Sequence, residues 1–259
     1  MEILSYNVEC PFFGVTSYED RLDMIIDKIM LNNITLILLQ EVFICSFLGI
    51  QLFSKVGYVE GKLREGGYEY FWGASDNWIF QNSGLFIASK YPIIPITEIH
   101  FPHHEGEEFF TQKGALIFKV KGFDITFVNT HLHCMHQSSK YDEIRKEQLL
   151  QIKDVLKGRN ITKNILIAGD MNIDQKSKKE KFMVDFLIGL FENGKDIFNN
   201  NIPITSPPNS RLDYMIYYGR KYYFINEKLF NANSLDKIVS DHIGIVGKIV
   251  AYNHYHTIF

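Results

Sequence analysis

Short apolar runs recur along the whole chain, and they constrain the fold more than any other feature of the sequence. Each run has the length of a β-strand and is bounded by glycine, proline, asparagine or charged residues. Several of the runs are rich in β-branched side chains, which favour strands. We therefore predict strands at residues 1–8, 35–39, 83–89, 115–120, 124–129, 164–168, 212–217 and 244–250.

Helical periodicity separates some of these runs. One apolar face is formed by Leu22, Ile25, Ile26 and Ile29 in residues 18–32, and another by Ile144, Leu149, Ile152 and Val155 in residues 142–156. Residues 183–191 form a third predicted helix. The order strand, helix, strand at the start of the chain, with an almost wholly apolar run at 36–39, indicates a βαβ unit with a buried second strand. Because later strands follow one another closely, we expect an α/β layered fold with mixed sheets.

The length and composition suit one large domain. The chain has 259 residues, of which 46% are hydrophobic and 14% aromatic, enough for a substantial core. No internal repeat, low-complexity tract or linker interrupts the sequence. We therefore expect a single domain over residues 1–259.

The charge balance says little about the substrate. A net charge of −3 and an isoelectric point near 6.3 argue against a protein that covers a polyanion with lysine and arginine. A nuclease is still possible, because a metal ion can supply the positive charge locally.

Cysteines and the N-terminal segment bear on the cellular setting. Cys10, Cys45 and Cys134 show no CxxC spacing, which indicates free thiols. The first ten residues do not resemble a signal peptide, and no run approaches the roughly 18 apolar residues of a membrane span. We expect a cytoplasmic protein, or one bound peripherally at membranes, without a transmembrane segment and monomeric.

Polar side chains end many of the apolar runs. These residues are Asn7, Glu41, Asn129, His131, Asp170, Asn172, Asp213, Asp241 and His242. Carboxylate and amide oxygens are ligands that Mg²⁺ prefers, and asparagine and histidine can donate hydrogen bonds to phosphate oxygens. Taken together, the set predicts a metal-dependent phosphoester hydrolase.

Each of these residues also has a purely structural interpretation. Asn7 can cap a strand, Asp170 can belong to a turn after Gly169, and His131 can be a satisfied core histidine. Glu41 is harder to explain in this way, because an unpaired charge at the end of a buried strand is costly.

The motifs that carry these residues resemble a known family. N-x-E at 7–9, LLQE at 38–41, NTHLH at 129–133, GDMN at 169–172, RLDY at 211–214 and SDH at 240–242 occur in this order over nearly the full chain. This set resembles the endonuclease/exonuclease/phosphatase superfamily of metal-dependent phosphoesterases. The resemblance implies a four-layer α/β/β/α sandwich of two mixed β-sheets flanked by helices, with the site at one edge.

The resemblance also implies a metal site. Glu41 would be the principal ligand of Mg²⁺, with Asn7 beside it and Asp241 close to this ion or to a second one. Mn²⁺ is a possible substitute. The role of Glu9 stays open, because members of the family differ at this position.

The remaining roles concern water and phosphate. Asp170 would orient or deprotonate the attacking water, Asn172 would hold the phosphate, and His131 would contact the phosphate or help the leaving group. His242 looks like the family's essential histidine, kept in its tautomer by Asp213. The general base stays open between Asp170 and His242.

Three stretches are similar to neutral and bacterial sphingomyelinases: NSGLFIASKYPI at 82–93, FFTQKGALIFKV at 109–120, and the NTHLHC block followed by a helix with Arg145 and Gln148. We therefore expect sphingomyelinase-like hydrolysis that releases phosphocholine from a membrane phospholipid. Alternatively, these motifs reflect packing, with Arg145 paired to a neighbouring acid, and the protein is an endonuclease or exonuclease acting on DNA or RNA. A non-catalytic binding module on the same fold is the minor alternative.

Aromatic residues crowd the segment 66–80, which also contains Gly66, Gly67 and Gly73. Trp72 and Trp78 are predicted substrate contacts, either in a membrane interface or against bases of a nucleic acid. The competing interpretation is that these rings fill the core.

Overall fold

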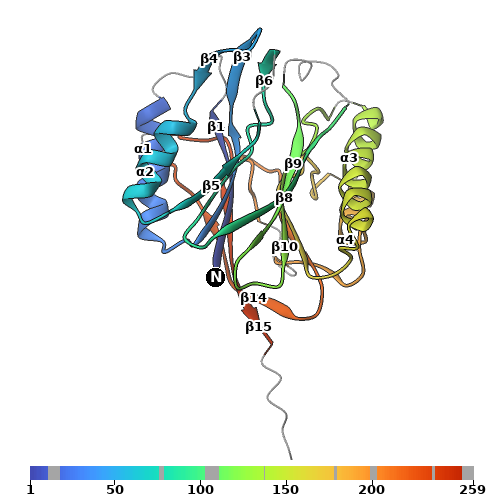
Figure 1. Ribbon diagram of the computed structural model, residues 1–259. Helices are drawn as coiled ribbons and strands as arrows, with labels where there is room; N and C mark the ends of the chain where they lie inside the picture. The colour runs from blue at the N-terminus through green and yellow to red at the C-terminus, as the bar shows by residue number, and fades with distance from the viewer. Residues whose placement is uncertain are drawn as a thin grey trace, which may run out of the picture.

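Two large β-sheets stacked face to face form the centre of the molecule (Figure 1). The computed structural model describes residues 1–10, 18–75, 79–102, 111–136, 138–177, 180–198, 203–234 and 237–252. The first sheet has the strand order β14-β15-β1-β2-β7-β5, and the second has the order β12-β13-β11-β10-β9-β8. Each sheet contains one parallel pair, β1 with β2 and β10 with β11, and its other pairs are antiparallel. The sheets are therefore mixed, as predicted.

The strands of the first sheet are β1 (Glu2–Cys10), β2 (Leu36–Val42), β5 (Tyr70–Gly73), β7 (Phe86–Ser89), β14 (Tyr222–Phe230) and β15 (Gly244–Ala251). Those of the second are β8 (Ile93–His100), β9 (Gly114–Val120), β10 (Thr126–His131), β11 (Ile165–Asp170), β12 (Gly194–Asp196) and β13 (Asp213–Tyr218). A third, smaller sheet has the order β4-β3-β6, built from β3 (Ile44–Phe47), β4 (Ile50–Ser54) and β6 (Ile79–Gln81).

Helices cover the outer face of each large sheet. Figure 1 shows α1 (Tyr18–Leu31) and α2 (Val56–Glu65) on one side of the molecule, and α3 (Ser139–Gly158) and α4 (Lys181–Ile188) on the other. The protein is thus a four-layer α/β/β/α sandwich, as expected. No helix within the described ranges is long and apolar enough to cross a membrane.

The alternation of side chains along a strand explains why the predicted strands are almost wholly apolar. In β2, Leu36 and Leu38 enter the core between the sheets, whereas Ile37 and Leu39 enter the core under α1 and α2. A strand between two apolar layers needs apolar residues on both faces. The same alternation in β11 sends Leu166 toward the first sheet.

The structure differs from the predicted elements at several places. Helix α3 begins at Ser139 rather than 142, because the hydroxyl of Ser138 accepts a hydrogen bond from the backbone of Lys140 and caps the helix. Helix α2 was not predicted, since it contains two glycines and buries only Val59 and Leu63. The hairpin of β3 and β4 was also missed, because its exposed residues are apolar and show no polar and apolar alternation.

A buried amide pair joins the two sheets near one end of the sandwich. The side chain of Gln40 donates to Asn129 Oδ1 at 2.7 Å, and the Asn129 amide donates to the carbonyls of Leu39 and Phe86. Asn129 belongs to the predicted polar set, and these hydrogen bonds show that its side chain connects the two sheets. It fixes the spacing of the strand ends that carry the candidate site.

Candidate active site

The predicted polar residues meet at the edge of the sandwich where β1, β2, β10 and β11 end. Register explains part of this convergence. His131 lies opposite Asp170 in the parallel pair of β10 and β11, and Asp170 lies opposite Asp213 in the antiparallel pair with β13. Three predicted residues therefore stand side by side on neighbouring strands.

Asn7 connects the two sheets at this edge. Its amide Nδ2 donates to Glu41 Oε1 at 2.9 Å and to Asp170 Oδ2 at 3.1 Å. Glu41 adopts a left-handed backbone conformation, with φ of 63°, at the point where β2 is about to end. Two carboxylates from different sheets thus share one amide.

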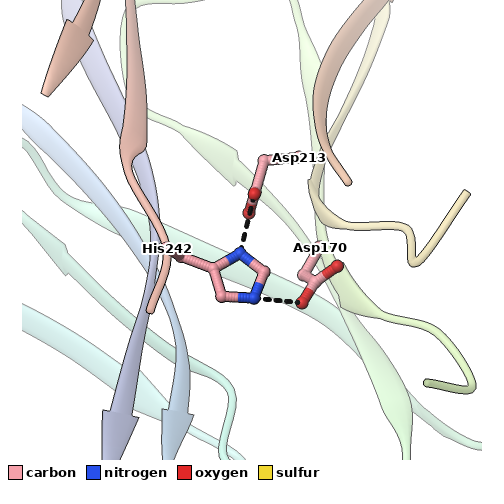
Figure 2. A group of neighbouring side chains, drawn as sticks. All are labelled: Asp170, Asp213 and His242. Carbon is pink, nitrogen blue, oxygen red and sulfur yellow. Dashed lines mark hydrogen bonds and ion pairs between the residues drawn. The ribbon is translucent and has the colours of Figure 1, made fainter. Parts of the chain in front are cut away.

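His242 forms the second connection (Figure 2). Its Nδ1 lies 2.8 Å from Asp213 Oδ2, and its Nε2 lies 3.5 Å from Asp170 Oδ2. The loop that carries His242 is held by Ser240, whose hydroxyl accepts from the His242 backbone and donates to the carbonyl of Asn7. The ring is therefore aligned between two buried carboxylates.

His131 lies on the other side of Asp170. Its Nε2 is 3.5 Å from Asp170 Oδ2 and 3.9 Å from Glu41 Oε1. The ammonium of Lys113 lies 2.8 Å from the same nitrogen, and Lys113 is only 4% exposed.

Lys113 was not among the predicted site residues. The sequence contained a signal for it, because a lysine that opens a strand-length apolar run is unusual, and lysine is almost never fully buried without a functional or structural partner. It was noted only as part of the strand motif at 109–120.

The pKa values of Asp170 and Glu41, the two carboxylates that share Asn7, are shifted in opposite directions. Burial by itself raises the pKa of Asp170, but the cationic groups of His242 and His131, with the Asn7 amide, hold the pKa of this carboxyl below its usual value. Burial raises the pKa of Glu41, and Lys113 and Asn7 oppose this increase only in part.

The pKa values of His242 and of its partner Asp213 are both raised. Burial lowers the pKa of His242, but the carboxylates of Asp213 and Asp170 outweigh it and raise that pKa well above the usual value. Burial also raises the pKa of Asp213 to about 6, against the effect of His242. The dominant effect is that two carboxylates face one imidazole, so the ring favours its protonated form.

The residues at Glu41 fit a divalent cation. A cation beside this partly buried carboxylate would offset the cost of desolvation that raises its pKa. Glu41 and Asp170 offer carboxylate oxygens, the hard donors that Mg²⁺ takes. Asn7 turns its Nδ2 toward both carboxylates while its Oδ1 accepts from the backbone of Glu9, so it would supply an amide oxygen only after its side-chain amide had turned over.

A second group of possible ligands lies next to it. One ligand atom from each of Asp170, Asp213 and His242 lies within 4.8 Å of the others. Both ring nitrogens of His242 already face carboxylates, however, so a proton can satisfy this group without a metal (Figure 2). This geometry suits proton transfer better than metal binding.

Asn172 and Asp241 border the cluster. The backbone of Asn172 donates to Asp170 Oδ1 at 2.9 Å, and its side chain donates to the carbonyl of Leu132. Asp241 lies at the rim, with a side chain that is 64% exposed and an oxygen 4.0 Å from His242 Nε2. Glu9 accepts a hydrogen bond from the backbone of Asp241 and forms an ion pair with Arg21.

Trp72 is not brought to this cluster. It lies on β5 at the edge of the first sheet, where its ring packs edge-on against Phe118 in the core between the sheets. This packing agrees with the core-filling interpretation of the aromatic segment. Trp78 lies outside the described residues.

The chain after His131 is held by α3. Buried Arg145 donates to the carbonyls of His133 and Met135 and pairs with Asp142, while Gln148 accepts from the backbone of His133. Arg145 and Gln148 thus support the site from outside, as in the packing alternative for these motifs.

Comparison with known proteins identifies the family. The model of the Endonuclease/Exonuclease/phosphatase family matches residues 4–242. Sphingomyelinase C of Bacillus cereus is 31% identical over 102 residues, which is 37% of this chain, and the match spans only 31% of that relative's length.

Solved structures show the same fold. An endonuclease/exonuclease/phosphatase family protein from Leptotrichia buccalis has a TM-score of 0.71 at 18% identity, with 96% of this chain and 99% of that chain covered. D. rerio TDP2 complexed with a single-strand DNA product has a TM-score of 0.67 at 18% identity, with coverage of 97% and 99%. At such identity the likeness concerns the fold alone.

Proposed function

Because the chain belongs to the endonuclease/exonuclease/phosphatase family, we propose that it is a divalent-metal-dependent phosphodiesterase that hydrolyses a choline phospholipid such as sphingomyelin. One observation carries the proposal of catalysis. Asp170 Oδ2 lies 3.1 Å from Asn7 Nδ2, 3.5 Å from His131 Nε2 and 3.5 Å from His242 Nε2. One carboxylate oxygen is therefore adjacent to a candidate metal site, a candidate phosphate contact and an imidazole. The single domain of residues 1–259 would hold the whole site.

Mg²⁺ is the ion that the donor set suits best, with Mn²⁺ as a substitute. Glu41 would hold it, with Asn7 beside it and Asp241 approaching from the rim. When bound, the ion would neutralise charge on the phosphoryl group and on the leaving oxygen.

The chain's own residues would position water and move protons. Asp170 would orient the attacking water, and Asp213 would fix the ring of His242 through Nδ1, with Nε2 facing Asp170. Asn172 and His131 would contact the phosphate. Either Asp170 or His242 would accept the proton of the water. His242 could do so only from its neutral form, whereas its raised pKa favours the protonated ring, which would instead stabilise the negative charge that develops.

The lipid substrate is favoured by sequence similarity to Sphingomyelinase C. The stretches that resemble sphingomyelinases in sequence include strand β9, which follows Lys113, and the chain that follows His131. The expected product is phosphocholine, released by attack of water on phosphorus.

A nuclease is the second candidate. The structural likeness to D. rerio TDP2 with a single-strand DNA product supports it, although that likeness concerns the fold. A non-catalytic binding module is the third, and the presence of every expected site residue argues against it.

The test is hydrolysis by purified protein, freed of metal with chelator and then supplied with Mg²⁺ or Mn²⁺. Sphingomyelin vesicles, plasmid and single-stranded DNA are offered in parallel. We expect phosphocholine release with DNA intact, and a loss of about 10²- to 10⁴-fold in His242→Ala, the range that general acid–base groups contribute. Asp124→Asn, a change in an exposed ion pair before the start of β10, should keep full activity.

The opposite outcomes separate the candidates. Cleavage of DNA with sphingomyelin untouched would establish the nuclease and retain the site. No metal-dependent cleavage of any substrate by a folded protein would favour the binding module. Circular dichroism of His242→Ala controls for misfolding.

A further inference from the structure

The hairpin formed by β3 and β4 carries an unusual concentration of exposed apolar side chains. Among the described residues 13 large hydrophobic side chains are exposed, and four of them fall between 47 and 52. These are Phe47 at 52%, Leu48 at 57%, Ile50 at 67% and Leu52 at 58% exposure. Exposed apolar residues are ordinary when they are scattered, but a contiguous patch marks an interaction surface.

The hairpin also lacks charge. Residues 44–54, ICSFLGIQLFS, contain no acidic or basic side chain. Strand β4 lies at the edge of the small sheet, and soluble proteins usually protect such edges with charged residues or proline. An uncharged apolar edge suits an apolar environment better than water.

The turn of the hairpin supports the same conclusion. Leu48 and Gly49 form it, with φ values of 51° and 78°. Asparagine, aspartate or glycine normally occupies the first of two such left-handed positions, because a branched apolar side chain is strained there. A leucine at this position contributes little to the turn itself and places an apolar side chain at the tip.

The small sheet is fixed to both sides of the candidate site. On one side β3 begins shortly after Glu41, and Asn82 Oδ1 accepts hydrogen bonds from the backbones of Ile44 and Gly84. On the other side Gln81 of β6 bonds to Thr111, close in sequence to Lys113. Figure 1 shows β3, β4 and β6 at the end of the sandwich toward which β1 runs from the N-terminus.

The length of the hairpin suits a shallow insertion. A strand rises about 3.3 Å per residue, so the tip at Leu48 lies roughly 13 Å beyond Ile44. Interfacial segments bury their apolar side chains about 5–10 Å into the boundary between headgroups and acyl chains. With the tip at that depth, the start of β3 would lie near the headgroups, where a lipid phosphodiester is found.

We propose that the β3–β4 hairpin inserts Phe47, Leu48 and Ile50 into the headgroup–acyl boundary of a choline phospholipid bilayer and so brings the active site to its substrate. This inference rests on the proposed lipid phosphodiesterase function. A bilayer is the preferred occupant over a second protein, because a stable protein interface buries about 800 Å² on each partner, more than a six-residue tip supplies. A bilayer requires no complementary shape.

The test compares the wild-type protein with Phe47→Ser, Leu48→Ser, Ile50→Ser combined in one variant. The matched control combines Leu31→Ser, Ile94→Ser and Leu229→Ser, three exposed apolar residues on other elements. Binding is measured by co-sedimentation with vesicles of sphingomyelin and phosphatidylcholine. Hydrolysis is measured on the same vesicles and on soluble bis(4-nitrophenyl) phosphate.

For the hairpin variant we expect at least a roughly tenfold loss of vesicle binding, from the apolar area that no longer leaves water, and a similar loss of vesicle hydrolysis. Turnover of the soluble ester should not change. The control variant should bind vesicles as the wild type does.

Two results would overturn the proposal: vesicle binding that is unaffected by the hairpin substitutions, or a wild-type dimer that the same substitutions convert to a monomer in sedimentation velocity. The two proposals fail separately. Turnover of the soluble ester without vesicle binding removes the membrane contact and keeps the phosphodiesterase. Hairpin-dependent vesicle binding without hydrolysis of any ester removes the catalytic function and keeps the membrane contact.

Discussion

At the scale of single residues, the site depends on backbone conformations that most side chains avoid. Three of the non-glycine residues with positive φ are Glu9, Glu41 and Asn172, all at or beside the candidate site. Such conformations persist where the surrounding structure holds them, and they are common at functional sites. Here they turn side chains at strand ends toward one another.

Gly169 is the residue whose replacement would disturb the site most directly. Its φ is 143°, and an added Cβ would lie 1.9 Å from the carbonyl oxygen of Thr130 on the neighbouring strand. We predict that Gly169→Ala lowers the free energy of unfolding by about 3 kcal/mol, because both the backbone and the strand contact are strained. Activity should fall at least about tenfold, since Asp170 is the next residue.

Urea unfolding and metal-dependent hydrolysis measure these two effects. Gly158→Ala is the control, because nothing lies within 4 Å of an added Cβ there. An unchanged unfolding midpoint in Gly169→Ala would contradict the close approach of β10 and β11.

At the scale of secondary-structure elements, buried arginines hold the connections beside the site. Arg211, two residues before Asp213, is fully buried and binds both carboxylate oxygens of Asp196 on β12, at 2.8 Å and 2.6 Å. Its guanidinium also lies 4.4 Å from the ring centroid of Tyr214. These contacts hold the chain just before β13 and therefore the position of Asp213, the first residue of that strand.

Removing one partner of this pair leaves a buried charge uncompensated. We predict that Asp196→Ala destabilises the protein by about 3–5 kcal/mol, the cost found for breaking buried ion pairs. Chemical denaturation measures it. Asp124→Ala, which breaks the exposed pair with Lys221, should cost about 1 kcal/mol or less. Equal effects of the two substitutions would show that the Arg211 pair contributes no more than a surface ion pair.

At the scale of the whole molecule, the site joins the two halves of the sandwich. Asn7 and Glu41 belong to the first sheet and Asp170 to the second, and the side chain of Asn7 bonds across the interface. A cation that binds these residues would therefore stabilise the packing of the sheets as well as the local loops.

Mg²⁺ should accordingly raise the temperature of unfolding. At ten times the dissociation constant a ligand adds about 1.4 kcal/mol, which corresponds to roughly 2–5 °C for a domain of this size. We predict this increase for the wild type and its loss in Glu41→Gln. Differential scanning calorimetry with and without chelator measures it, with exposed Glu143→Gln as control. The same increase in Glu41→Gln would place the ion elsewhere.

Much of the architecture could be predicted from the sequence, because it depends on local patterns. A strand buried on both faces must be apolar throughout, as residues 36–39 are, and a helix that covers a sheet must be apolar on one face, as in α1. The polar residues at the strand ends could be named as a candidate set for the same reason. Their order along the chain identified the family, and the match over residues 4–242 confirmed it.

Tertiary structure decided which of these side chains meet and which surface stays uncovered. Asn7 and Asp170 are 163 residues apart, and only sheet register and sheet packing bring them together. The same packing placed Lys113 beside His131 and set the partly buried Trp72 against the core between the sheets. A sequence pattern records whether a side chain prefers water or a core, but not which distant segment covers it, so the exposed tip around Leu48 could be recognised only in the folded chain.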